Sequence, residues 1–351
     1  MRARDLGVVI GEHPTGPHNA ITDVPGVRVG HTTLQGDGIN TGVTVVVPHE
    51  DIWTEPVFAG SHVLNGSGEL TGLEWIRESG ELTTAIGLTN THSVGVVRDG
   101  LVAEQVRVRG DGAYWSLPVV GETYDGFLND INGFHVRPEH VRAALADAGD
   151  GPVAEGNVGG GTGMICHQFK GGIGTASRVN GHTVGVLVQA NHGRRDRLRI
   201  NGVPVTQPEV PLPDHPPGYL PGSGSIIVII ATDAPLLPHQ CRRLAQRSAL
   251  GVGRLGGSGE QYSGDLMFAF STGNRGIPPY GGADTDRAAA EIPLRMVGPQ
   301  QMDLLFDLTI EATEEAIVNA MVSAETVTGY RGFTAHAIDH DLLASALGER
   351  P

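Results

Sequence analysis

The chain has 351 residues, of which 52 are glycine and 22 are proline, and its formal net charge at pH 7 is −15. This length gives one large domain or two modest ones with a sizeable core, and the glycine content predicts many tight turns. The acidic balance, without a cluster of arginine or lysine, argues against binding to nucleic acid or to anionic membranes.

The cysteine content and the apolar runs of the sequence indicate the cellular compartment of the protein. Cys166 and Cys241 are too few for a disulfide framework or a cysteine-based zinc site. Residues 1–16 lack the apolar stretch of a signal peptide, and the longest apolar run, 226–231, is far too short to span a membrane. We therefore expect a cytoplasmic protein with neither a membrane nor a nucleic-acid partner.

In the first 200 residues, short runs rich in β-branched residues and bounded by glycine, asparagine or proline predict strands. These runs cover residues 27–29, 44–47, 84–88, 94–97 and 183–189. Two helical patterns interrupt them, over 68–79 and 138–148. The second has a proline just inside its start and a glycine just after its end, which is typical of a helix.

The second half of the chain begins with a proline-rich segment. Residues 204–221 include seven prolines, a density that favours an extended surface segment. The continuous apolar run that follows, 225–231, predicts a strand buried on both faces. Further patterns predict a helix over 235–250, a strand over 265–271, a helix over 300–324 and a short strand within 325–337. Clustered strands followed by long helices indicate an α+β fold with helices covering a sheet.

Four motifs that resemble ligand sites also have plain structural explanations. The G-x-G-x-x-G match at 251–256 follows a predicted helix, whereas a dinucleotide site needs a preceding strand. The glycines of 159–163 form either an anion cradle or a tight turn. The histidine pair at 336 and 340 lacks the glutamate of H-E-x-x-H and indicates a solvated segment. The Cys-His pair at 166–167 has no third member and indicates a buried, inert cysteine.

The Gly224-Ser225 junction has the residues for self-processing. A serine hydroxyl is a weak nucleophile without an adjacent base. A cut before Ser225 would place an α-amine, with an unperturbed pKa of about 7.7–8.0, beside its own Oγ. In the uncut chain the same Oγ can attack the Gly224 carbonyl carbon, where glycine offers the least steric obstruction. A plain turn before a core strand is the alternative, and on the residues alone it is the stronger explanation.

The segment GSGSIIVIIATDAPLLPHQCRRLAQRSALGVGRLG resembles the start of the β-subunit of the DmpA family. That family comprises the L-aminopeptidase D-Ala-esterase/amidases and the β-peptidyl aminopeptidases. Other stretches agree with the family in the same order: RARDLG, NAITDVPGVRVGHTTL, NGSGELTG, GLTNTHSVG, PVVGETYDGFLNDING, EGNVGGGTGMICHQFKGGIGTASR, TVGVLVQANHG, YSGDLMFAFSTGN and EEAIVNAMVSAETVTG. The resemblance therefore covers nearly the whole chain.

The resemblance implies a four-layer αββα sandwich of the DmpA and ornithine-acetyltransferase type, similar to the N-terminal-nucleophile hydrolases. It implies a single hydrolase domain over 1–351, cut before the nucleophile into an α-chain, 1–224, and a β-chain, 225–351. It also implies no metal or organic cofactor, and a homo-oligomer that we expect to be a tetramer of αβ units.

On the same resemblance Ser225 is the nucleophile, and Ser263 and Asp265 are the second serine and its acidic partner. Residues i and i+2 of a strand point to the same face, so this pair is expected to share one site. Some family members carry glutamate at the position of Asp265. Asn191 matches the family's asparagine, whose amide can stabilise an oxyanion. For all of these residues the alternative is a polar position at a turn or strand end.

The segment 121–130 is expected to complete the site. Tyr124 is the predicted hydroxyl donor. An aminopeptidase must also bind the free amine of its substrate, which requires a carboxylate. Glu122, Asp125 and Asp130 are the candidates; we favour Glu122, and each of them is also explained as a turn residue.

The sequence thus predicts a self-processing serine aminopeptidase or amidase that releases N-terminal residues from small peptides, amides or esters. One alternative is an acyltransferase or an amide-oligomer hydrolase on the same fold, although such enzymes typically use threonine where this chain has Ser225. Another is an unprocessed, non-catalytic relative that acts as a binding module. The choice between α- and β-amino substrates, and between L and D residues, is left open.

Overall fold

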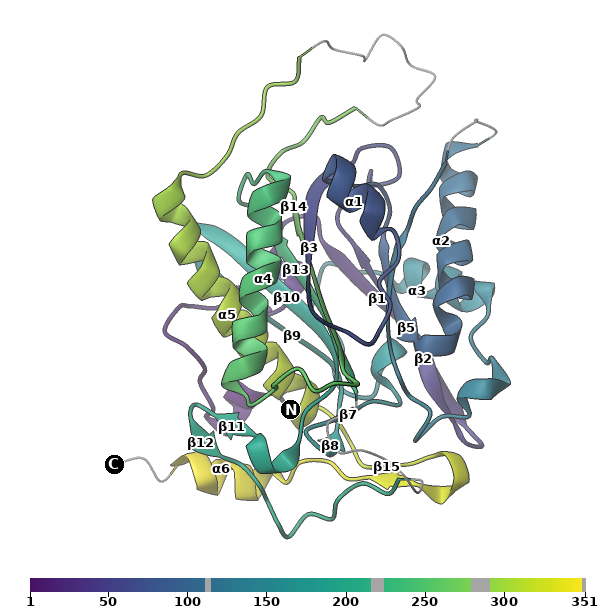
Figure 1. The fold of residues 1–351 in the computed structure, drawn as a ribbon, viewed down its shortest axis with the longest axis vertical. Helices are drawn as coiled ribbons and strands as arrows, with labels where there is room; N and C mark the ends of the chain where they lie inside the picture. The colour runs from purple at the N-terminus through teal and green to yellow at the C-terminus, as the bar shows by residue number, and fades with distance from the viewer. Residues whose placement is uncertain (111–114, 216–223, 279–290, 349–351) are drawn as a thin grey trace.

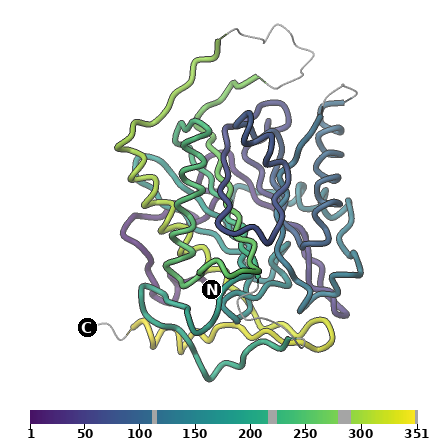
Figure 2. Tube along the Cα trace, viewed as in Figure 1, coloured from purple at the N-terminus to yellow at the C-terminus, as the bar shows by residue number. Residues whose placement is uncertain are grey.

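The computed structural model describes residues 1–110, 115–215, 224–278 and 291–348. Two β-sheets lie face to face, and helices cover their outer sides (Figure 1). Helices α4 (Pro238–Arg254) and α5 (Pro299–Val322) pack on one sheet. Helices α2 (Val94–Arg109) and α3 (Pro138–Asp147) pack on the other, and the trace in Figure 2 shows the two helix pairs on opposite sides. The predicted αββα layering is confirmed.

The larger sheet has six strands in the order β4-β3-β14-β13-β10-β9. Its central pair, β13 and β14, is parallel, and the other neighbours are antiparallel. The strands are β4 (Glu81–Leu82), β3 (Val57–Gly66), β14 (Gly264–Ser271), β13 (Ser225–Thr232), β10 (His182–Asn191) and β9 (Gly172–Asn180).

The smaller sheet has four strands in the order β1-β2-β5-β6, with β5 and β6 parallel. They are β1 (Arg28–Gly36), β2 (Ile39–Val47), β5 (Ile86–Asn90) and β6 (Val119–Thr123). Three short hairpins lie outside the main sheets: β7 (Ile165–Cys166) with β8 (Phe169–Lys170), β11 (Arg199–Ile200) with β12 (Val203–Pro204), and β15 (Val327–Thr328) with β16 (Thr334–Ala335).

Within the described residues, the remaining α-helices are α1 (Leu73–Ser79) and α6 (His340–Gly348). Short 3-10 turns connect the elements, at Ala3–Leu6, Ile21–Asp23, Thr91–Ser93, Ile131–Gly133, Gly159–Gly161, Arg195–Arg197 and Tyr330–Gly332. No helix within the described ranges is long and apolar enough to cross a membrane.

Strand β13 is buried along its whole length because it separates two cores. Successive side chains of a strand point to opposite faces. Ile226, Val228 and Ile230 belong to the core beneath α4 and α5. Ile227 and Ile229 belong to the core between the two sheets. The continuous apolar run predicted a strand buried on both faces, and that prediction is confirmed.

The predicted strand over 94–97 is wrong, because these residues form the first turn of α2. Their β-branched side chains favour a strand, but Val94, Val97 and Leu101 are buried at helical spacing. The helix predicted over 68–79 begins only at Leu73. The other predicted strands and helices overlap observed elements of the same type.

Two predicted surface segments are partly buried. In the proline-rich stretch, Val205 and Gln207 are buried, while its residues 216–221 lie outside the described ranges. The C-terminal segment predicted to be solvated buries Ile338, and His340 Nε2 lies 2.8 Å from the Val322 carbonyl oxygen. The glycines of 159–163 form a buried turn: a Cβ on Gly160 would stand 2.2 Å from Gln189 Oε1, so protein atoms fill that space.

Candidate active site

Three neighbouring strands of the larger sheet, β10, β13 and β14, have termini close together at one end of the sheet. Asn191 is the last residue of β10, and in the antiparallel register it lies opposite Ser225, the first residue of β13. Ser225 also pairs with Gly264, the first residue of the parallel strand β14. A cavity of about 560 Å³ opens here, lined by Ser67, Gly68, Glu69, Thr91, Glu122, Tyr124, Phe127, Asn191, Gly224, Ser225 and Tyr262.

The backbone N–H of Gly264 faces the Gly224-Ser225 peptide bond. It donates to the Gly224 carbonyl oxygen at 3.1 Å and lies 3.2 Å from Ser225 Oγ. A donor at such a distance can stabilise the negative charge that develops on a carbonyl oxygen under nucleophilic attack. The same N–H therefore contacts both the Ser225 hydroxyl and the carbonyl group of the peptide bond that precedes it.

Gly224 is required by the close approach of the neighbouring strand. A Cβ at this position would stand 2.0 Å from the Asn191 carbonyl oxygen, a distance that real Cβ atoms essentially never show. Glycine avoids this clash because it has no side chain. The residue before Ser225 is thus determined by packing against β10 as well as by access to its carbonyl carbon.

The Asn191 side chain is held at both ends and lines the cavity. Its Oδ1 accepts a hydrogen bond from the Ile165 N–H at 2.7 Å, and its Nδ2 donates to the Tyr124 carbonyl oxygen at 2.9 Å. A carboxamide nitrogen carries two N–H groups, so the second one is free to serve a carbonyl oxygen in the cavity.

Ser263 and Asp265 lie together behind the cavity edge. Ser263 Oγ donates a hydrogen bond to Asp265 Oδ1 at 2.6 Å, and both residues are buried. Burial raises the pKa of Asp265 to about 6, although the bond from Ser263 opposes this shift. The pair flanks Gly264, whose N–H contacts Ser225, and neither member is among the residues that line the cavity.

Of the three candidate carboxylates, Glu122 alone lines the cavity with Ser225. Its Oε1 accepts the Glu69 N–H at 2.9 Å, and its Oε2 accepts the Thr91 hydroxyl. Burial raises the pKa of Glu122, and these two hydrogen bonds oppose the rise. The fixed carboxylate is therefore suited to receive a cationic amine.

Asp125 and Asp130 lie elsewhere. Asp125 is fully buried, where its two oxygens accept hydrogen bonds from the Asn90 and Asn129 side chains at 3.0 and 3.1 Å. Asp130 Oδ2 lies 3.7 Å from His135 Nε2. Both carboxylates thus have structural partners outside the cavity.

Tyr124 forms part of the cavity wall, with its side chain 40% exposed and its ring 5.4 Å from that of Phe127. Burial raises the pKa of its phenol, so the hydroxyl is a proton-bearing donor at neutral pH. Its backbone carbonyl also orients Asn191, a second contribution that the residue type alone does not indicate.

Several residues at the site were not singled out from the sequence. The Gly264 N–H has no signature because every residue but proline has one, although Gly264 lies between Ser263 and Asp265. Residues 67–69 and Thr91 lie in NGSGELTG and GLTNTHSVG, two of the stretches that resemble the family. The family resemblance of these stretches was visible in the sequence, but the residues themselves did not show that the stretches face Ser225.

The fold and the site together define a layered serine hydrolase. A serine lies among amide donors and beside a cavity with a fixed carboxylate, and the two sheets that carry it are covered by helices. The match to a family profile is consistent with this class. Residues 19–335 match peptidase family S58, and the chain belongs to that family.

Curated and solved relatives agree with the family. The chain is 47% identical to the "Beta-peptidyl aminopeptidase BapA" of Sphingosinicella microcystinivorans, over 99% of this chain and 91% of the relative. It matches a Burkholderia sp. beta-aminopeptidase structure at 54% identity, with a TM-score of 0.93 and full coverage of both chains.

A second structure is the L-aminopeptidase D-Ala-esterase/amidase of Ochrobactrum anthropi, described as a prototype for the serine aminopeptidases and a variant of the Ntn hydrolase fold. It matches at 44% identity, with a TM-score of 0.89, over 99% of this chain and 98% of the other. Family and structural neighbours together support a serine aminopeptidase of the N-terminal-nucleophile type, with peptide or amide substrates.

Proposed function

We propose that the chain cuts itself between Gly224 and Ser225, and that Ser225 then acts as the N-terminal nucleophile of an aminopeptidase. The observation that carries this proposal is the Gly264 N–H, 3.1 Å from the Gly224 carbonyl oxygen and 3.2 Å from Ser225 Oγ. The products are an α-chain, 1–224, and a β-chain, 225–351, of one hydrolase domain.

Self-cleavage begins when Ser225 Oγ attacks the Gly224 carbonyl carbon. The Gly264 N–H holds the resulting oxyanion, and the proton of the hydroxyl passes to the departing amide nitrogen of Ser225. The product of this step is an ester between Gly224 and the Ser225 side chain. Water hydrolyses the ester, which leaves a carboxylate on Gly224 and frees both the hydroxyl and the α-amine of Ser225.

The same groups then act on substrate. The α-amine of Ser225 accepts the proton of Oγ as Oγ attacks the substrate carbonyl carbon. The Asn191 amide and the Gly264 N–H hold the oxyanion, with the Tyr124 hydroxyl as a further donor from the cavity wall. The leaving amine takes the proton, and water releases the acyl group. Asp265 and Ser263 hold the Gly264 segment in place behind the nucleophile.

The substrate is a small peptide, amide or ester with a free amino group, which Glu122 binds as an ammonium ion. Two of the relatives compared above are named for β-amino substrates, so we propose β-aminoacyl amides as the preferred class. We also propose a cytoplasmic homo-oligomer, a tetramer of αβ units, whose mass in solution is measurable by light scattering.

Hydrolysis of paired chromogenic amides tests the proposed function. The β-alanyl and L-alanyl p-nitroanilides are each compared with their N-acetylated counterparts, using wild-type enzyme and Ser225→Ala. We expect release of p-nitroaniline from the free amines only, faster from the β-alanyl substrate, and none with Ser225→Ala. Equal rates on the N-acetylated compounds would refute amine recognition, and transfer to an added amine acceptor in place of hydrolysis would favour the acyltransferase alternative.

A further inference from the structure

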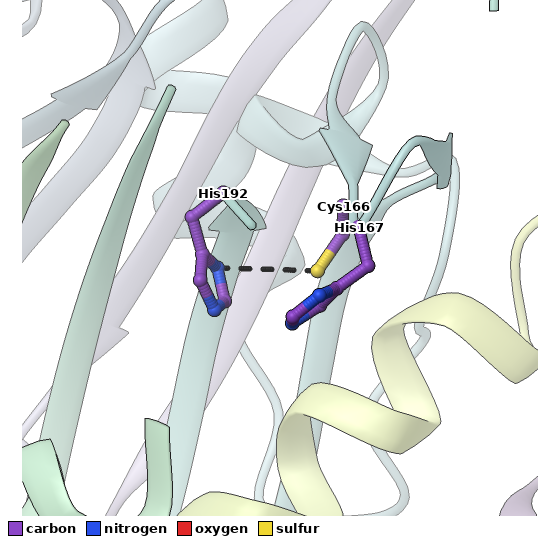
Figure 3. Close-up of side chains that lie close together, drawn as sticks. All are labelled: Cys166, His167 and His192. Atoms are coloured by element: carbon purple, nitrogen blue, oxygen red, sulfur yellow. Dashed lines mark hydrogen bonds between the residues drawn. The ribbon is translucent and has the colours of Figure 1, made fainter. Parts of the chain in front are cut away.

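A cluster of Cys166, His167 and His192 lies next to the candidate active site but takes no part in the proposed reaction. In the sequence, the pair at 166–167 has no third member; the fold supplies His192, the residue directly after β10 (Figure 3). The Cys166 Sγ and one ring nitrogen of each histidine lie within 4.8 Å of one another. Cys166 Sγ and His192 Nδ1 are 3.9 Å apart.

The imidazoles of this cluster are buried, and their hydrogen bonding is incomplete. Cys166 and His167 are inaccessible to solvent, and His192 is 3% exposed. Within the described part of the chain, Nε2 of His167 and Nε2 of His192 have no hydrogen-bond partner. Buried side-chain nitrogens usually have one. Nε2 of His31, His49 and His135 also lacks a hydrogen-bond partner, so the pair at 167 and 192 is distinguished by the buried thiol that lies beside both rings.

The hydrogen bonding of His167 leaves one of its ring nitrogens available as a ligand. Its Nδ1 lies 3.1 Å from the Arg194 carbonyl oxygen, which can only accept, so Nδ1 carries the proton. The lone pair is then on Nε2. A ligating histidine typically donates its other ring N–H to a carbonyl or a carboxylate in this way.

We propose that Cys166, His167 and His192 bind one thiophilic transition-metal ion, with Zn²⁺ as the representative of its class. Thiolate and imidazole ligands together favour Zn²⁺ and its late transition-metal neighbours over Mg²⁺ or Ca²⁺. Ligands of one tetrahedral zinc ion lie roughly 3.6 Å apart for a sulfur and a nitrogen, so the 3.9 Å between Sγ and Nδ1 needs little adjustment. His192 therefore binds through Nδ1 and keeps its ring proton on Nε2, while His167 binds through its unpartnered Nε2. Three protein ligands leave a fourth position for water.

Burial favours the neutral histidines that metal binding needs, but it also raises the pKa of the Cys166 thiol to about 12, so the metal must displace a proton from the sulfur. Burial holds the pKa of His167 at about 4 and the pKa of His192 well below its usual value, so both rings are neutral and keep a lone pair. Binding replaces the Cys166 S–H bond by a sulfur–metal bond, and the proton leaves to solvent. No electron is transferred.

The ion would stabilise the two segments that hold Asn191. The Ile165 N–H, one residue before Cys166, donates to Asn191 Oδ1 at 2.7 Å. The His167 N–H donates to the carbonyl oxygen of His192, the residue after Asn191, at 2.6 Å. Metal ligands in both segments would therefore hold the Asn191 side chain in place, and the site has a positioning role in the proposed reaction.

Metal content of the untagged protein tests the proposal. Because the ligands are buried, the ion must enter as the chain folds, so the protein is produced in cells supplied with Zn²⁺ or Co²⁺ and dialysed before elemental analysis. Wild type is compared with Cys166→Ser and with Cys241→Ser, the other buried free cysteine. We expect one ion per chain in wild type and in Cys241→Ser, and at least a tenfold loss in Cys166→Ser.

The Co²⁺-loaded wild-type protein gives a second readout that needs no variant. Thiolate bonded to Co²⁺ has a ligand-to-metal charge-transfer band in the near ultraviolet, and tetrahedral Co²⁺ has strong visible bands. We expect both, and a higher Tm for the loaded protein than for protein from metal-depleted cells. Protein with less than a tenth of an ion per chain, or a Co²⁺ spectrum without the thiolate band, would overturn the proposal.

Discussion

Replacing Gly224 by alanine is expected to slow self-cleavage by about two orders of magnitude. The new Cβ would stand 2.0 Å from the Asn191 carbonyl oxygen, whereas real Cβ contacts are essentially never under 3.0 Å. The start of β13 and the end of β10 must therefore separate by roughly 1 Å, and a misplacement of that size costs about 10²-fold in rate.

The clash lies between two groups that have a role in the proposed mechanism. Strand β13 lies between β10 and β14, so a shift of Gly224 away from Asn191 pushes it toward Gly264 and disturbs the 3.1 Å hydrogen bond from the Gly264 N–H to the Gly224 carbonyl oxygen. Overpacking of this kind also costs about 1–3 kcal/mol of stability. The assay is a time course of cell-free synthesis, with the uncut and cut chains separated on a denaturing gel.

Gly253→Ala is the matched control for this variant. Gly253 lies in α4, where a Cβ would meet nothing within 4 Å, so the same added methyl group is harmless there. We expect cleavage at the wild-type rate and a gain of up to about 1 kcal/mol in helix stability. If Gly224→Ala also cleaved at the wild-type rate, the close packing of Asn191 against the junction would have no part in the reaction.

Three further predictions concern pH, substrate binding and stability. Burial raises the pKa of Asp265 from 3.8 to about 6, so protonated Asp265 stabilises the folded protein below about pH 4, and this contribution is lost as the pH rises through 6. The ionised fraction of Asp265 rises over the same interval. We expect kcat/KM to rise through about pH 6 as Asp265 ionises, and to rise again as the Ser225 α-amine, with an unperturbed pKa of about 7.7–8.0, loses its proton. Asp265→Asn should remove the first rise and keep the second; a first rise that remains would show that Asp265 is not its cause. Glu122→Gln should raise KM for free-amine substrates by at least about 10-fold, since a charged hydrogen bond contributes about 1.5–3 kcal/mol. Self-cleavage should be unchanged, and an unaltered KM would mean that another residue binds the substrate amine. Arg178→Met should lower the free energy of unfolding in urea by about 1–3 kcal/mol, because Glu311 and Glu315, 3.1 and 2.7 Å from the guanidinium, lose a buried partner, although Arg4 still pairs with Glu315 at 2.8 Å. An unchanged free energy of unfolding would contradict this.

The strands were largely predictable because burial leaves a pattern in the chain. A core strand between two hydrophobic layers must be apolar at every position, and residues 226–230 are. The pattern failed at 94–97, where three valines in four residues favour a strand locally. The burial of Val94, Val97 and Leu101 on one side of α2 is a longer-range pattern that a four-residue window does not contain.

The site was predictable only in part, since its geometry depends on strand register. The resemblance singled out Ser225 and Asn191, but only the pairing of β10 with β13 places them opposite each other. Choosing among the three carboxylates required knowing that β6 directs Glu122 into the cavity. The Gly264 N–H and the meeting of His192 with residues 166–167 are consequences of the fold, so residue types alone could not indicate them.

Intact mass under denaturing conditions, with wild type beside Ser225→Ala, tests the central claim most directly. Dividing the 36.8 kDa of 351 residues by length gives roughly 23.5 kDa for residues 1–224 and 13.3 kDa for residues 225–351. We predict these two pieces in wild type and one uncut chain in Ser225→Ala. A wild-type chain that remains at 36.8 kDa after long incubation would contradict self-processing at Ser225 and the mechanism built on it.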